Sequence, residues 1–90
     1  MKKVDANQKV VVDQLRRIGC SVTSIAQCGK GVPDLIVGFK KKNYLIELKD
    51  GNKKPSARKL TPDEIEFHAK WRGQVAVCNS FDEILKLINN

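Results

Sequence analysis

Apolar and polar positions follow two different periods along this chain, and the changes of period divide it into helices and strands. Val11, Leu15 and Ile18 recur at helical spacing, which predicts an amphipathic helix over residues 5–18 that ends at Gly19. Residues 20–26 alternate loosely and contain β-branched side chains, so they predict a first strand. The glycines of residues 27–32 predict a loop before the next apolar run.

Two central runs, residues 34–39 and 44–49, alternate with a period of two, so successive side chains would point to opposite faces of a sheet. If the runs pair as a hairpin through residues 40–43, their two wholly apolar sides share one face. The same register brings Asp34 close to Glu47 on the other face, together with Lys49. Because acids and lysines are rarely buried without a partner or a metal, this second face is the candidate functional site.

The second half of the chain predicts a loop, a helix, a strand and a last helix. Residues 50–59 are polar, basic and interrupted by Gly and Pro, which predicts an exposed, mobile loop. A capping box at residues 61–64 predicts a helix that ends at Gly73, and residues 74–78 predict a buried strand. Residues 80–83 predict a second capping box before the last helix. The order αβββαβα indicates one domain over residues 1–90, with a mixed sheet of the α/β or α+β class.

Composition narrows the class of partner. The chain has 17 Lys and Arg against 10 Asp and Glu, and the net charge of +7 favours a polyanion such as nucleic acid. Its 3 cysteines lack metal-ligand spacing, which predicts small buried side chains and reduced thiols in a cytosolic protein. The basic start is not followed by an apolar stretch, and the sequence predicts a soluble protein without a membrane span.

The acids and the lysine suggest a chemistry. Two carboxylates on neighbouring strands can share a divalent cation such as Mg²⁺ or Mn²⁺, and Lys49 could position an attacking water or neutralise a phosphate. Together they predict metal-assisted phosphodiester hydrolysis. A Glu-x-Lys triplet is a weak pattern by itself, however, and the alternative is a same-face ion pair between Glu47 and Lys49, with Asp34 a turn residue.

The order of motifs resembles a known family. Pro33-Asp34 followed by Glu47-Leu48-Lys49 resembles the active-site motif of the PD-(D/E)XK nuclease superfamily. The flanking residues 29–35, 44–51, 60–64 and 73–77, with Phe67 and Trp71, resemble the stand-alone VRR-Nuc domains of phages and prophages. This resemblance covers nearly the whole chain and implies an α/β, restriction-endonuclease-like core, in which helices flank a mixed sheet in the order αβββαβα.

The resemblance also implies a nuclease that depends on Mg²⁺ or Mn²⁺. Asp34, Glu47 and the backbone carbonyl of Leu48 would ligate the metal, and Lys49 would act on the nucleophilic water. Family members often carry a further glutamate on the first helix. Near that position this sequence has Asn7 and Gln8, so Gln8 is the candidate neutral ligand or water-holder.

Partners follow from the same resemblance. Stand-alone members act as homodimers on branched DNA such as four-way (Holliday) junctions, and a phage or prophage protein would act in the bacterial cytoplasm. The helix with Phe67 and Trp71 is either a dimer face or part of the monomer core, and His68 is expected to be a surface or helix-packing residue without an obvious partner. The basic side chains expected near DNA phosphates are Lys30, Lys53, Lys54, Arg58 and Lys59.

Two other functions stay open on the sequence alone. One is a nuclease-fold protein that binds DNA without cleaving it, and the other is a basic interaction module. The complete set of Asp34, Glu47 and Lys49 favours the nuclease, whereas the neutral Gln8 keeps the non-cleaving alternative open.

Overall fold

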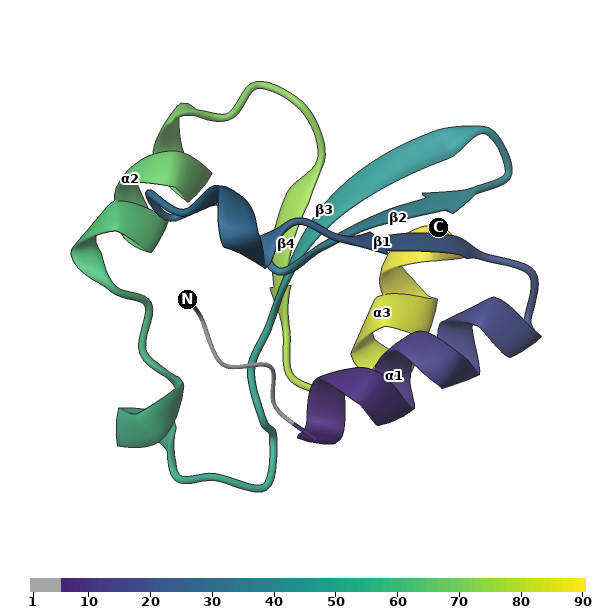
Figure 1. Ribbon diagram of the computed structural model, residues 1–90, viewed down its shortest axis with the longest axis horizontal. Helices are drawn as coiled ribbons and strands as arrows, with labels where there is room; N and C mark the ends of the chain where they lie inside the picture. The colour runs from purple at the N-terminus through teal and green to yellow at the C-terminus, as the bar shows by residue number, and fades with distance from the viewer. Residues whose placement is uncertain (1–5) are drawn as a thin grey trace.

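The computed structural model describes residues 6–90, which follow the predicted order αβββαβα (Figure 1). The helices are α1 (Ala6–Arg17), α2 (Pro62–Lys70) and α3 (Phe81–Ile88), and the strands are β1 (Ser21–Ser24), β2 (Leu35–Phe39), β3 (Lys42–Leu48) and β4 (Val75–Cys78). Two short 3₁₀ helices, η1 (Ala26–Cys28) and η2 (Pro55–Arg58), lie in the connections that follow β1 and β3. The predicted start of the first helix at Asp5 lies outside the described residues.

The four strands form one mixed sheet in the order β1-β2-β3-β4. β1, β2 and β3 are antiparallel neighbours, and β4 runs parallel to β3. Leu35 pairs with Ile46 and Val37 with Tyr44, which is the register that the apolar pattern predicts. The mixed α/β fold predicted from the sequence is therefore confirmed. Within residues 6–90, no helix is both long enough and apolar enough to cross a membrane.

The apolar core lies between one face of the sheet and the helices α1 and α3. Leu15 of α1, Leu35 and Ile46 of the hairpin, and Ile84 of α3 are completely buried. Figure 1 shows α1 and α3 side by side, with α2 well apart from both. The face of the sheet that carries Glu47 is consequently not part of this core, because Glu47 alternates with Ile46 along β3.

The three cysteines are free, as predicted, but they occupy different environments. Cys20 and Cys78 are buried in the core, whereas Cys28 is exposed, so the prediction of a buried side chain is wrong for Cys28. It lies at the end of η1, where the chain turns over the surface. Burial raises the pKa of the Cys78 thiol to about 11, which keeps it protonated at neutral pH.

The hairpin turn is tighter than predicted. Phe39 pairs with Lys42, so only Lys40 and Lys41 connect the strands, instead of residues 40–43. Both lysines have positive φ, at 51° and 66°, as a two-residue type I′ turn requires. Because Asn and Gly are the residues that usually mark this turn, the two lysines gave no signal of it.

Capping side chains fix the starts of α2 and α3. Thr61 Oγ1 accepts a hydrogen bond from Glu64 N at 3.2 Å, and Glu64 Oε1 accepts one from Thr61 N at 2.9 Å, which confirms the predicted capping box. At α3 only half of the second box forms. Ser80 Oγ accepts from Glu83 N, but Glu83 Oε1 accepts from Asn79 N at 3.0 Å because it reaches one residue further back.

The end of α2 also differs from the prediction. The helix ends at Lys70 instead of continuing to Gly73, because Trp71 takes an extended conformation. The Trp71 N–H still donates to the Phe67 carbonyl at 3.0 Å and so closes the last turn.

Gly31 brings the loop before β2 into contact with the start of α2. Its φ is +80°, and a Cβ at this position would overlap the backbone carbonyl of Asp63 and lie 2.8 Å from Glu64 N. Only a residue without a side chain allows this approach. The contact fixes the loop that leads to Asp34 against the helix that carries Glu64.

We expect Gly31→Ala to destabilise the protein more than Gly19→Ala, a matched control that also has positive φ (+96°) but has no atom within 4 Å of the point that a Cβ would occupy. Gly19→Ala should lower the free energy of unfolding by about 1–2 kcal/mol through backbone strain alone. Gly31→Ala should cost about 1–3 kcal/mol more, because α2 must move. Urea denaturation measures both, and equal losses would contradict the close contact.

Candidate functional site

Asp34 is the residue immediately before β2, and its carboxylate connects the ends of two strands. Its side chain is buried, and Oδ2 accepts a hydrogen bond from Leu48 N at 2.9 Å. The Asp34 carbonyl also accepts a hydrogen bond from Ile25 N at 2.9 Å. Because Leu35 pairs with Ile46, the same register places Asp34 opposite Glu47. The buried acid is therefore fixed at the end of the β2–β3 ladder.

Glu47 of β3 and Lys49, the residue that follows this strand, lie on the side of the sheet that points away from the apolar core. Glu47 is only 1% exposed, and the Lys49 ammonium lies 3.7 Å from Glu47 Oε2. The structure thus brings Glu47 and Lys49 into contact and places Asp34 on the neighbouring strand end, as the period of the strands predicts. Burial of two acids beside one lysine is costly, which distinguishes this site from a solvated surface pair.

A third acid, Glu64, enters the site from α2. Its side chain is buried, and Oε1 accepts hydrogen bonds from both Lys49 Nζ at 3.2 Å and Thr61 N at 2.9 Å. One carboxylate therefore caps α2 and also holds the lysine. The sequence assigns Glu64 to the capping box alone, because that motif already explains an acid at this position.

His68 lies one helical turn after Glu64, within electrostatic reach of the site. Burial lowers the pKa of its imidazole, and the charge of Lys49 lowers it as well, whereas the charge of Glu64 raises it. The His68 Nε2 is buried and makes no hydrogen bond to residues 6–90, so the prediction of a histidine without an obvious partner is not contradicted. The separation of four residues places His68 beside Glu64 on one face of the helix. It connects His68 with the site only because Glu64 contacts Lys49.

The donor set around Asp34 and Glu47 fits a hard divalent cation. Both carboxylates are more than nine-tenths buried, and Mg²⁺ is commonly held by one or two carboxylates while water and phosphate complete its coordination. Among residues 6–90, no group of three or more His, Cys, Asp or Glu side chains could hold a metal ion. Glu64 is thus placed as a partner of Lys49. Gln8 is buried on the same stripe of α1 as Val11 and Leu15, and its role stays a prediction.

The predicted basic residues occupy two kinds of environment. Lys30, Lys53, Lys54 and Lys59 are exposed. Arg58 is half-buried and lines a pocket of about 360 Å³ together with Asp50 and Asn79. Its Nε is buried and makes no hydrogen bond within the described part of the chain. The exposed lysines are therefore better placed than Arg58 for contact with a phosphate backbone.

Comparison with known proteins gives one structural relative. No family model and no curated protein match the sequence. A solved chain titled "VRR_NUC domain" is similar over 92% of this chain and 90% of its own length, with a TM-score of 0.66 and 29% sequence identity. This similarity confirms the resemblance to VRR-Nuc domains and the mixed α/β fold, and it supports a nuclease domain.

The charges around His68 can be tested because it is the single histidine of the chain. Lys49→Met should raise the pKa of His68, since it removes a cation that disfavours the imidazolium. Glu64→Gln should lower that pKa further, since it removes an anion while a glutamine still suits the capping box. NMR titration of the imidazole protons measures both shifts. Lys86→Met, on α3, is the control and should leave the pKa unchanged, and shifts of the same sign in the two site variants would contradict the geometry.

Proposed function

Because the chain has the fold of a VRR-Nuc domain, we propose that it is a metal-dependent nuclease that hydrolyses phosphodiester bonds in DNA. The observation that carries this proposal is the burial of Asp34 and Glu47 at neighbouring strand ends, beside Lys49. A merely structural ion pair would need one acid for one lysine. This site instead combines three acids, Glu64 included, with a single lysine.

Asp34, Glu47 and the backbone carbonyl of Leu48 would hold Mg²⁺ or Mn²⁺, with Gln8 as a further neutral ligand or water-holder. The bound cation would supply Lewis-acid stabilisation of the scissile phosphate. The hydrogen bond from Leu48 N to Asp34 Oδ2 keeps one oxygen of this acid occupied and so orients the other. Because the acids are fixed by the β2–β3 ladder, little reorganisation is required when a cation binds.

Lys49 would position the attacking water and stabilise the charge that develops on the phosphate. Its ammonium is held by Glu64 at 3.2 Å and lies 3.7 Å from Glu47 Oε2, so its direction is set from both the helix and the strand. Glu64 is accordingly a positioning residue.

The substrate we propose is branched DNA, with four-way junctions as the leading example, cleaved by a homodimer of phage or prophage type. A domain with one site can cut two strands symmetrically only when a second copy supplies the second site, and a two-fold dimer matches the symmetry of a junction. The net charge of +7 and the exposed lysines suit a phosphate backbone, which gives affinity without sequence readout.

The second candidate function is DNA binding without cleavage. It is favoured by the neutral Gln8, which is buried on α1 where relatives of this kind often carry a glutamate. The two functions differ in one measurable respect, since only the nuclease would make DNA turnover depend on Asp34 and Glu47.

We expect Asp34→Asn and Glu47→Gln each to lower the rate of DNA cleavage with Mg²⁺ or Mn²⁺ by more than about a hundredfold, because each removes a charged metal ligand. Both changes keep the side-chain shape, so circular dichroism should show an intact fold. Asp13→Asn, an exposed acid on α1, is the matched control and should cleave like the wild type. A panel of linear, flap and four-way substrates with and without EDTA provides the assay. Unchanged cleavage in either site variant would refute the assignment.

The exposed lysines after β3 should contact phosphates. We expect Lys53, Lys54 and Lys59 changed together to Gln to reduce the slope of log affinity against log salt by up to about 3, or about one for each lost contact. The same triple change at Lys40, Lys41 and Lys42 removes equal charge at the hairpin turn and should alter the slope less. Equal changes in the two variants would assign the effect to net charge alone.

A further inference from the structure

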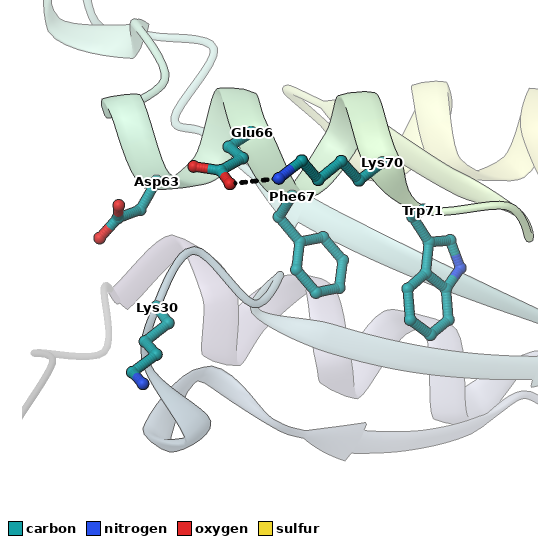
Figure 2. A pocket seen from close by; sticks show the side chains of 6 residues that line it. All are labelled: Lys30, Asp63, Glu66, Phe67, Lys70 and Trp71. Carbon is teal, nitrogen blue, oxygen red and sulfur yellow. Dashed lines mark hydrogen bonds and ion pairs between the residues drawn. The ribbon is translucent and has the colours of Figure 1, made fainter.

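Two aromatic rings, those of Phe67 on α2 and of Trp71 directly after it, are stacked on each other outside the apolar core. The ring centroids of Phe67 and Trp71 lie 5.2 Å apart, with an interplanar angle of 13°. Trp71 is 47% exposed, and neither ring belongs to the core cluster formed by residues of the described chain. The alternative that both rings complete the monomer core is therefore wrong. Figure 2 shows both rings extending from the same side of α2.

The rings line an open cavity of about 510 Å³ that has charged residues around its rim. Its lining residues are Lys30, Asp63, Glu66, Phe67, Lys70 and Trp71. Lys70 is paired with Glu66 at 2.6 Å, as the dashed line in Figure 2 marks. Lys30 lies on the loop that faces α2, is exposed, and forms no ion pair within residues 6–90. The cavity thus combines an aromatic wall with an exposed ammonium group, that of Lys30, as a candidate contact for a phosphate.

The Trp71 ring contacts neighbours of the same chain on two sides. One side of the indole stacks on Phe67, and its Nε1 lies so close to the backbone of Gly73 that a Cβ there would be 2.8 Å away. A larger residue at position 73 would displace the ring. An aromatic surface that is ordered before binding loses little conformational freedom when a ligand stacks on it.

The cavity also borders the acidic site. Glu64, which holds Lys49, lies on α2 one turn before Phe67 and His68, and Gly31, next to Lys30, contacts the backbone of Asp63. The walls of the cavity are therefore joined directly to the elements that carry the acids and the lysine.

We propose that this cavity binds one unpaired nucleotide of DNA, with its base stacked on Trp71 and its phosphate beside Lys30. The proposal rests on the proposed function and specifies the substrate further, as DNA with unpaired bases beside the bond to be cut. Stacking accepts any base, because every base has a π-face, and so it adds affinity without adding sequence preference. The volume is also within the range of about 300–1,000 Å³ found for small-ligand sites.

A second copy of the chain fits this surface less well. Ile65, the large exposed hydrophobic residue of α2, is two positions from Phe67 and so lies on the opposite side of the helix. The rings are surrounded by Lys30, Asp63, Glu66 and Lys70. A stable interface buries about 800 Å² on each partner, whereas one aromatic side chain supplies about 150–250 Å².

The wild-type protein offers a direct test, because Trp71 is the single tryptophan of the chain. Titration with a short oligothymidylate in EDTA should quench its fluorescence. A strand of equal length with abasic sites retains the phosphates and should bind without quenching. Equal quenching by both strands, or none by either although anisotropy shows binding, would overturn the proposal. A shift of the emission with protein concentration in the absence of DNA would overturn it too, in favour of a second copy at this surface.

Substitutions of Trp71 provide a second test, through the affinity for oligothymidylate. Trp71→Leu keeps an apolar side chain without a π-face and should weaken oligothymidylate binding about five- to a hundredfold, whereas Trp71→Phe should lose much less. Ile65→Ala, on the opposite side of α2, is the matched control. An equal loss of affinity for single-stranded and fully paired DNA in Trp71→Leu would overturn the stacking role.

This test is independent of cleavage. The nuclease proposal fails if wild-type protein with Mg²⁺ or Mn²⁺ cuts none of the DNA panel, whatever the binding data show. The stacking proposal fails if base-containing and abasic strands behave alike in EDTA, whatever the protein cuts.

Discussion

The ion pair between Lys49 and Glu64 joins the sheet to the helix α2. Two charges at 17% and 6% side-chain exposure cost much of their hydration, and such a pair is retained only when further hydrogen bonds compensate. Here Thr61 N supplies one, and the capping box and the site share a single carboxylate oxygen. Because no residue of α2 is in the apolar core cluster of the described residues, this polar contact and the close approach of Gly31 are the contacts that connect α2 to the sheet and to the loop before β2. The position of the cavity lined by Phe67 and Trp71 depends on the same two contacts, the Lys49–Glu64 ion pair and the approach of Gly31 to α2.

Much of the fold could be predicted because its pattern is local. The alternation of β2 and β3 fixed their register, since a slip of one residue would turn Leu35 and Val37 away from the core. That register by itself places Asp34 and Glu47 together. The start of α2 was predictable for a similar reason, because the capping box is complete within four residues.

What the sequence did not reveal depends on contacts between distant segments. The second role of Glu64 was hidden because the capping box already explained that acid, and His68 then had no visible partner. The exposure of Trp71 was equally hidden. Its spacing from Phe67 is that of any apolar helix face, and only the fold shows that the sheet face below α2 lies outside the core. The two-residue turn of Lys40 and Lys41 was missed because its usual residues are absent.

The parallel pairing of β3 with β4 has a consequence for the order in which the molecule assembles. The β2–β3 hairpin closes through two residues, and such local contacts form on the microsecond scale. β4 can pair with β3 only after the whole of α2 and its connections have crossed over, which carries a larger loop-closure entropy. The two strand acids are thus aligned by a hairpin with a two-residue turn, whereas Lys49 meets Glu64 across a separation of 15 residues within the crossover. The candidate site therefore combines a local strand pairing with a contact made inside the crossover, so a change in the length of the connection between β3 and α2 would act on the lysine and not on the alignment of the acids.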